Sequence, residues 1–222
     1  MTRQMILPLI FGLAGVAVLC GLGTWQVQRL AWKEGVLAEI EARIAADPVA
    51  VPVAPDPDVD GYLPVRAEGR FGEGEIHVLV SVKQVGAGYR VIAPFEVDGR
   101  RVLVDRGYLP LEEKDAARPP LEAVVTGNLH WPDERDSFTP ENDLGAGIWF
   151  ARDVAALAAA LETEPVLIIA RGSTGQGITP LPVDTSAIPN DHLGYAITWF
   201  SLAAVWAGMT GFFLWRIRRR TE

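Results

Sequence analysis

The chain has 222 residues, enough for one sizeable domain with additional segments. Leaving out Arg3, the four C-terminal arginines and Glu222, 15 basic and 27 acidic residues remain, a net charge of −12. This sign argues against a nucleic-acid partner, since phosphate binding needs basic residues. The single cysteine, Cys20, lies in an apolar stretch, so the sequence has neither a disulfide nor a Cys-x-x-Cys redox motif.

Two stretches are long enough and apolar enough to cross a membrane. Residues 6–27 and 193–215 carry no charge, and a buried helix of a soluble protein rarely runs about 20 residues without one. The first could be a cleaved signal peptide, but it is long for that class and no small-x-small cleavage site follows it. We therefore predict an uncleaved transmembrane helix at 6–27 and a second at 192–215.

Basic residues predict the orientation. Arg3 precedes the first span and four arginines follow the second, so residues 1–5 and 216–222 are expected in the cytoplasm, although Arg29 and Lys33 run slightly against the rule. No amphipathic transit segment rich in Arg and Ser precedes the first span, which indicates a bacterial protein. The prediction is a multi-pass protein of the bacterial inner membrane with its central part in the periplasm.

The part between the spans changes from a helical to a strand-like pattern. Residues 28–46 predict an amphipathic helical extension, and the Pro- and Asp-rich residues 47–62 predict an extended connector. From Leu63 the apolar residues recur with a period of two, and Asp98-Gly99 is a hairpin signal. We predict a membrane-anchored α+β protein whose periplasmic domain, 47–191, is mostly antiparallel β with one or two helices. Its predicted elements are strands at 63–71, 75–82, 89–97, 100–109 and 122–131, a short strand around Trp149, a helix at 153–161 and a strand at 165–171.

His192 stands at the start of the second predicted span. Tyr195, Trp199, Leu202 and Trp206 follow it at helical spacing and form an aromatic stripe below the imidazole. One interpretation is an interfacial histidine above an aromatic belt. The other is an axial ligand above a flat hydrophobic slot suited to haem, whose iron accepts a neutral imidazole and whose propionates prefer water.

The outer end of the first span offers an opposite wall. Trp25, Arg29 and Trp32 share one helix face, and Arg29 or Lys33 could pair with a propionate. The alternative is an arginine that snorkels between belt tryptophans. The small-x-x-x-small pairs Ala17–Gly21 and Ala204–Gly208 permit close helix packing, or simply reflect how common small residues are in spans.

The remaining motifs predict no catalytic set. His77 and His130 lie in or beside predicted strands and are interpreted as structural, and no H-x-x-x-H zinc pattern occurs. The segment GSTGQG (172–177) resembles a phosphate loop only loosely, because it lacks the Gly-Lys-Ser/Thr ending. The sequence therefore favours a protein that is not an enzyme.

Four motifs give the chain a family resemblance. LGTWQVQRLAWK (22–33), GYRVIAPFEVDGRRVLVDRGYLP (88–110), FTPENDLGAGIWFARDVAALAAAL (138–161) and PNDHLGYAITWFSLAAVW (189–206) resemble blocks of the Surfeit locus protein 1 family. The departures are small: Ala93, Asp105 and Tyr108 stand where the family often has Thr, Asn and Trp.

The resemblance implies a factor for cytochrome c oxidase biogenesis that binds haem a and assists its insertion into oxidase subunit I. Carried over, the second-span histidine is His192, the axial ligand of the haem iron. We add the hypothesis, from the residues themselves, that Trp25, Trp199 and Tyr195 wall the macrocycle and that Arg29 meets a propionate. The partners implied are subunit I, the lipid bilayer and, as a further candidate, haem a synthase. The alternative is a scaffold for subunit I that binds no haem. Whether two copies share one haem as a homo-oligomer stays open.

Overall fold

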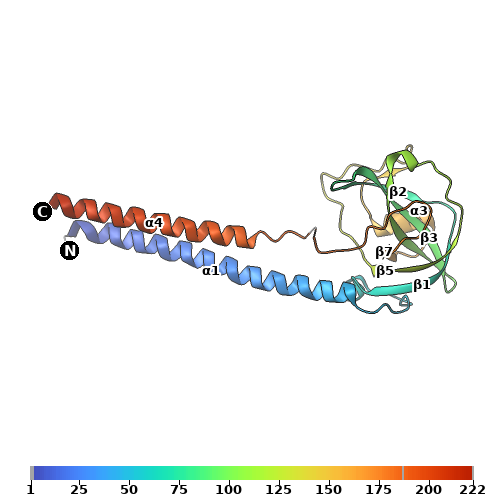
Figure 1. Cartoon of the computed structure of the whole chain (residues 1–222), viewed down its shortest axis with the longest axis horizontal. Coiled ribbons are helices and arrows are strands. Elements are labelled where there is room, and N and C mark those ends of the chain that lie inside the picture. Colours follow the sequence, from blue (N-terminus) through green and yellow to red (C-terminus); the bar gives the residue numbers. More distant parts are fainter. Residues whose placement is uncertain (1–2, 187, 222) are drawn as a thin grey trace. The chain divides into compact units, whose positions relative to one another are not determined.

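The computed structural model describes residues 3–186 and 188–221. It divides into two compact units: Met1–Glu39 with Thr185–Glu222, and Ile40–Asp184. The first consists of long helices and the second contains the sheet. Figure 1 labels elements of both units.

Two long helices form most of the first unit, although the last residues of one of them, 40–45, belong to the second unit. Helix α1 spans Arg3–Ala45 and α4 spans His192–Thr221. Both contain windows long and apolar enough to cross a membrane, and only 6% of each window is buried. Such exposed apolar surface suits a helix surrounded by lipid, because lipid imposes no penalty on apolar side chains. The sequence prediction of two long apolar helices that bracket a sheet-rich domain is confirmed.

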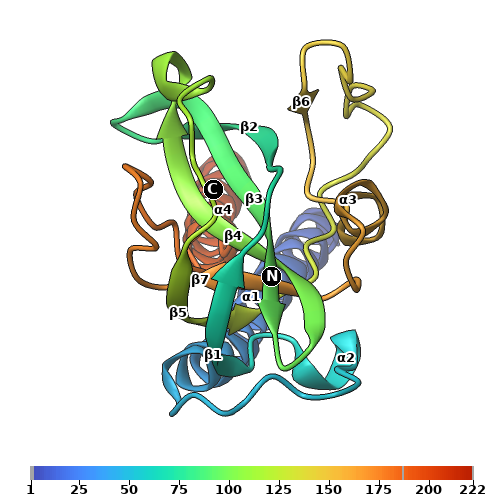
Figure 2. The ribbon, with the colours of Figure 1, turned by 90° about the vertical axis from the view of Figure 1, so that its right-hand side faces the viewer.

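Within the described residues, seven strands form one sheet in the order β1-β5-β7-β4-β3-β2-β6. An additional β1–β3 pairing closes it into a barrel. Figure 2 labels the strands of this barrel, β1, β3, β4, β5 and β7. A methyl group on Gly69 would lie 1.9 Å from the carbonyl oxygen of Glu96, so the close approach of β1 to β3 requires glycine. The strands are β1 Pro64–Phe71, β2 Ile76–Val82, β3 Gly86–Val97, β4 Arg100–Pro110, β5 Glu122–Leu129, β6 Ile148–Trp149 and β7 Leu167–Ala170.

Most pairings are antiparallel, as the sequence predicts, but β4–β7 and β2–β6 are parallel. Helix α3, Val154–Leu161, begins at Asp153, whose side chain accepts a hydrogen bond from the Ala156 amide. Two short elements were missed because each spans a single turn: α2, Pro57–Asp60, in the predicted connector, and the 3-10 helix η1, Leu111–Glu113.

Alternation along the strands builds two large apolar clusters and a small one of Val91, Leu109 and Ile178. One large cluster includes Phe71, Phe95 and Ile168; the second includes Ile92, Leu103 and Leu157, the last of which comes from α3. Strand β4 contributes to both large clusters because its successive side chains point to opposite faces. Its register against β3 shifts between Arg90 and Ile92, which is a β-bulge, and the buried polar residues Asp105 and Arg106 lie at this shift.

Candidate functional site

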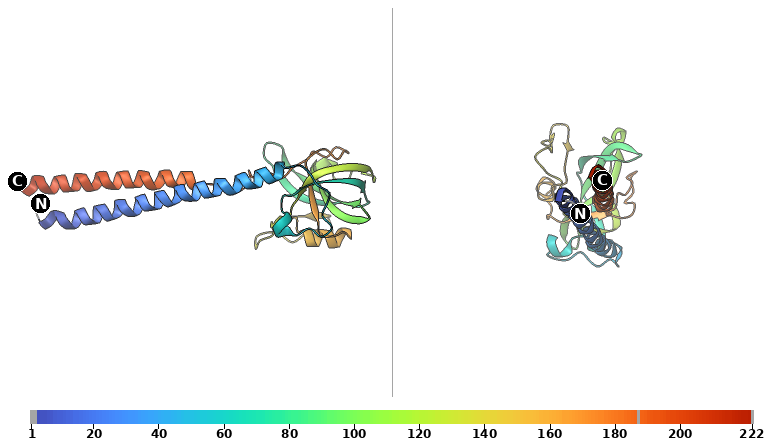
Figure 3. Two further views of the ribbon diagram at one scale, coloured as in Figure 1. Left: turned by 90° about the horizontal axis from the view of Figure 1, so that it is seen from below. Right: turned by 90° about the vertical axis from the view of Figure 1, so that its left-hand side faces the viewer.

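The first candidate site lies within the helical unit, where α1 and α4 run side by side in opposite directions (Figures 1 and 3). Its inner faces carry small residues: a methyl group on Gly12 would lie 2.1 Å from the Thr210 side chain, and Ala196 and Ala203 are buried seven residues apart. Small residues let helix backbones approach closely in the absence of a hydrophobic driving force.

The small-residue pairs singled out in the sequence do not make this contact. Apart from its own helix backbone and chain neighbours, a methyl group on Gly21 or Gly208 would meet no heavy atom of the described residues within 4 Å, and Ala17 and Ala204 are not buried. Of the two interpretations, close packing is therefore wrong for these pairs, because the same spacing occurs on several faces of each helix. Only the partner helix determines which face is used.

His192 and Gln26 meet across the helix pair. The Nδ1 atom of His192 lies 2.7 Å from the Oε1 atom of Gln26, and Gln26 is only 8% exposed. Because an amide oxygen only accepts, Nδ1 carries the proton in this arrangement. The lone pair of the neutral ring is then on Nε2, which has no hydrogen-bond partner among the described residues.

This hydrogen bond is the arrangement that metal-ligating histidines use. Such a histidine donates its second ring N–H to a nearby acceptor, which fixes both the tautomer and the orientation of the ring. The sequence analysis assigned roles to Trp25 and Arg29 on the same helix but none to Gln26. A signal was available: a glutamine that interrupts an apolar span needs a polar partner.

The aromatic stripe of α4 contains both half-buried and exposed residues. Trp199 and Trp206 are half-buried, whereas Tyr195 and Leu202 are exposed. Trp206 donates its indole N–H to the carbonyl oxygen of Gly12 at 3.1 Å. Leu202 and Trp206 both line a groove that α1 residues also line, so the exposed and half-buried positions of the stripe do not by themselves divide it into two faces.

The face of α1 that carries the predicted arginine points outward. Trp25 is 54% exposed, and Arg29 is exposed with its guanidinium 4.0 Å from the ring centre of Trp32. This cation–π contact keeps Arg29 at the level of the tryptophan. The structure thus brings His192 to Gln26 and Arg29 to Trp32.

Two apolar grooves run along the helix pair. Their volumes are about 700 and 480 Å³, and Phe11, Trp206 and Met209 line both. Each is large enough for an apolar ligand or a side of another helix. Neither lining includes His192.

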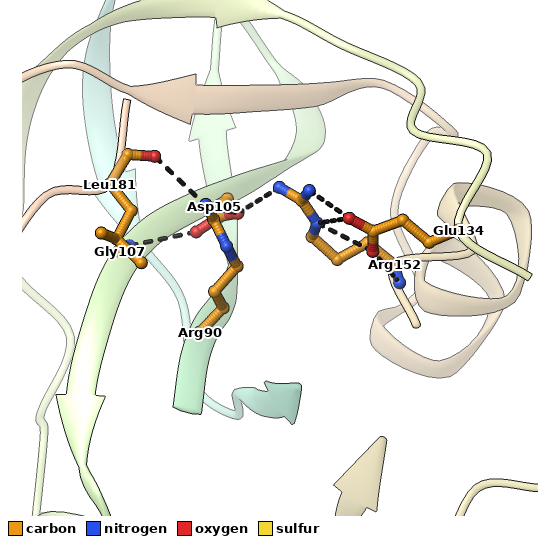
Figure 4. A network of polar contacts seen from close by, with 6 residues as sticks. All are labelled: Arg90, Asp105, Gly107, Glu134, Arg152 and Leu181. Carbon is orange, nitrogen blue, oxygen red and sulfur yellow. Dashed lines mark hydrogen bonds and ion pairs between the residues drawn. The ribbon is translucent and has the colours of Figure 1, made fainter. Parts of the chain in front are cut away.

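The second unit holds a buried ionic network, shown in Figure 4. Asp105 is fully buried; its Oδ2 accepts from Arg90 at 2.6 Å and from Arg152 at 3.1 Å, and its Oδ1 accepts from the Gly107 amide. Arg152 also binds Glu134. Burial alone would raise the pKa of Glu134, but the hydrogen bonds and charge of Arg152 outweigh it and lower that pKa. Two cations and two anions balance, so the network is structural.

Among the described residues, no group of three or more His, Cys, Asp or Glu side chains gathers as metal ligands do. His192 is the one candidate ligand in the described part of the chain that combines a free ring nitrogen with a buried partner on its other nitrogen. A site of this kind suits a cofactor that brings most of its own ligands, as haem does.

The chain thus combines two candidate membrane helices with a closed sheet domain that lies between them in the sequence. A model of the SURF1 family matches residues 13–204. The chain is 32% identical to Surfeit locus protein 1 of Xenopus tropicalis, covering 82% of this chain and 68% of the relative. The human protein of that name is 31% identical (83% and 70%), and a SURF1-like protein of Monosiga brevicollis is 32% identical (85% and 80%). The chain belongs to the SURF1 family, whose members are cytochrome oxidase assembly factors rather than enzymes.

Proposed function

We propose that this chain binds haem a and assists its insertion into subunit I of cytochrome c oxidase, with His192 Nε2 as the axial ligand. The observation that carries the proposal is the 2.7 Å contact between His192 Nδ1 and Gln26 Oε1, which leaves Nε2 available. The haem would supply an iron that accepts this nitrogen and propionates that seek cations.

In this proposal, each residue has a separate role. Gln26 holds the ring of His192 in one orientation and one tautomer. Trp199, half-buried on the same helix as His192, offers an aromatic wall, and Tyr195 and Trp25 offer two more from exposed positions. Arg29 pairs with a propionate from its place over Trp32. A single protein ligand favours release, because a second would hold the iron more tightly.

The test is pigment analysis of the full-length protein, purified in detergent from cells that make haem a. We expect a Soret band and extractable haem a in the wild type, and loss of both in His192→Ala. Gln26→Ala should weaken haem affinity by roughly 10–100-fold, the usual effect of removing a histidine's supporting acceptor. Gln28→Ala is the matched control, because Gln28 is exposed on the same helix.

The outcomes separate the parts of the proposal. Unchanged haem content in His192→Ala would show that the ligand is another residue. Equal effects of Gln26→Ala and Gln28→Ala would remove the positioning role of Gln26. A wild-type protein that carries no haem under any expression condition would leave only the second candidate function.

The second candidate is a scaffold that stabilises subunit I without binding haem. The two apolar grooves favour it, because they could receive a transmembrane helix of a partner. A photo-crosslinking side chain at Met209, which lines both grooves, should then capture subunit I or haem a synthase. The neighbouring exposed Gly208 is the matched control position. A crosslink to a second copy of this chain would instead indicate a homo-oligomer.

The proposal places both termini in the cytoplasm of a bacterium and the sheet domain in the periplasm. It rests on the two apolar helices and on the arginines at 216 and 218–220. The chain has a single cysteine within α1, so cysteines introduced after Cys20→Ser report accessibility directly. A cysteine at exposed Glu68 should react with an impermeant maleimide in intact spheroplasts, and one at exposed Arg219 should not.

A further inference from the structure

Arg106 is a buried cation that has no ion-pair partner in the described part of the chain. Its side chain is only 2% exposed, with the guanidinium carbon 4.4 Å from the ring centre of Phe71. Among the described residues, no carboxylate forms a salt bridge with it, although Arg90 on the neighbouring strand pairs with Asp105. Burying an uncompensated charge is costly, so its presence requires an explanation.

The segment 172–177 surrounds Arg106 with oxygen atoms. Arg106 donates to the Thr174 hydroxyl at 3.0 Å, to the carbonyls of Thr174 and Gly175 at 3.1 and 3.4 Å, and to Gln176 Oε1 at 2.9 Å. A phosphate loop presents N–H groups to an anion, whereas this loop presents acceptors to a cation. These contacts use four of the five guanidinium N–H groups. They leave one N–H on Nη1 free.

A cavity of about 150 Å³ adjoins Arg106. One part of its lining is charged, from Arg106, Arg118 and Glu75; another part is apolar, from Phe71, Ala93 and Pro119. Arg118 is already paired, because its Nε donates to Glu75 Oε1 at 2.7 Å and its other nitrogens bind backbone carbonyls. Glu75 also lies 3.0 Å from His77 Nε2.

The charges of the lining leave one positive charge unbalanced. Burial alone would raise the pKa of Glu75, but the hydrogen bonds from His77 and Arg118 outweigh it and lower that pKa, so Glu75 is ionised at neutral pH. Burial lowers the pKa of Arg106 to about 10, which still leaves it protonated. Two arginines and one glutamate therefore give the cavity a net charge of +1.

If Arg106 served only to anchor the segment 172–177, its positive charge would not be needed. The carbonyls of Thr174 and Gly175 could be bound by neutral donors, which would avoid the burial cost. A cation beside a cavity, with one N–H unused, is instead what an anion site needs.

We propose that this cavity binds one carboxylate group carried on a short apolar body. A single negative charge matches the net +1 of the lining, whereas a phosphate dianion would leave excess negative charge beside Glu75. Phe71, Ala93 and Pro119 give an apolar body a surface to contact, and the volume admits a ligand of a few heavy atoms. The carboxylate can belong to a free small acid or to an acidic side chain of a protein.

The test is a titration of full-length, isotope-labelled protein in detergent, followed by NMR. At constant ionic strength, propionate should shift the amide signals of Gly72 and Gly74, which line the cavity, with a Kd of roughly 1–10 mM, as expected for so small a ligand. Propionamide, which has the same shape without the charge, should cause no shift. Phosphate should bind at least about fivefold more weakly than propionate.

Charge variants sharpen the test. Glu75→Gln raises the lining to +2 and should tighten propionate binding by about 3- to 10-fold while admitting phosphate. The matched control is Glu68→Gln, which makes the same charge change at an exposed position. Arg106→Gln should weaken binding more than tenfold; if that variant does not fold, the Glu75→Gln result decides.

Two comparisons identify the source of the carboxylate. Tighter binding of a doubly blocked glutamate than of propionate indicates an acidic side chain of a protein partner, and the reverse indicates a free small acid. The proposal is overturned if propionamide shifts the same signals, if the shifts are spread over the surface, or if Glu75→Gln binds propionate no more tightly than Glu68→Gln does.

Discussion

Asp105 and Arg106 are neighbours in β4, both are buried, and they belong to networks of different kinds. Asp105 lies between Arg90 and Arg152, and Glu134 completes a neutral set. Arg106 lies among carbonyl oxygens beside a cavity and keeps an unmatched charge. A balanced network supports the fold by itself, whereas an unbalanced one marks a place where a ligand can contribute the missing charge.

The largest effect is expected from Asp105→Ala. It leaves Arg90 without its carboxylate and removes one partner of Arg152, and loss of one member of a buried pair costs about 3–5 kcal/mol. Hydrogen exchange of the β3 and β4 amides in the full-length protein measures this loss. Asp105→Asn, which keeps an acceptor for the Gly107 amide, should lose less. A loss below about 1 kcal/mol in Asp105→Ala would show that the network is not structural.

Arg106→Met should cost less than Asp105→Ala, about 1–3 kcal/mol. The loop carbonyls of Thr174 and Gly175 lose their donor, but the variant also removes an unbalanced buried charge, which offsets part of that loss. The same hydrogen-exchange measurement compares the two variants directly. The distinction between the networks fails if Arg106→Met proves the more damaging of the pair.

A smaller effect is expected from His130, near the Asp105 network. Burial, followed by the charge of Arg152, lowers its pKa in the folded protein below 6.5. The unfolded chain therefore binds the proton first as the pH falls, so stability is full above pH 6.5 and declines below it. Urea unfolding at pH 7.5 and 5.5 should show this decline, and His130→Gln should reduce it. An unchanged pH dependence in His130→Gln would assign the decline to another group.

The smallest effect is expected from Arg135→Ala. Its ion pair with Glu141 is exposed on both sides, and exposed pairs contribute about 0–1 kcal/mol. Urea unfolding should differ from the wild type by less than about 0.5 kcal/mol. A larger loss would mean that exposure is a poor guide to which ion pairs of this domain matter.

The strands were predictable because their signal is local. Alternation of apolar residues and Gly-containing turns predicted β1 to β5 within a few residues, and Asp98-Gly99 correctly predicted the β3–β4 hairpin. The insertion of β7 between β5 and β4 and the closure of β1 on β3 were not predicted, because they depend on pairings of residues far apart in the sequence. One residue in the sequence reflects the closure: position 69 must be glycine because Glu96 lies beside it, but that neighbour is known only from the structure.

The candidate site was predictable in part. Chain position and residue type singled out His192, and the structure gives it a partner. That partner, Gln26, lies on another helix 166 residues away, so its role depends on the helix–helix register. The surroundings of Arg106 could not be predicted from the sequence for the same reason, since the oxygen atoms that accept its hydrogen bonds come from the distant residues 174–176.

The central place of β7 has a consequence for folding. This last strand pairs with β4 in parallel and with β5 in the antiparallel sense. Both earlier strands therefore have an unpaired edge until residues 167–170 have been added. A newly made chain cannot complete its barrel until nearly the whole domain has been synthesised, and such long-range pairing is slow. During that interval the open strand edges can join those of other chains. Cells that produce this protein should therefore benefit from a holdase that protects it until its final strand arrives.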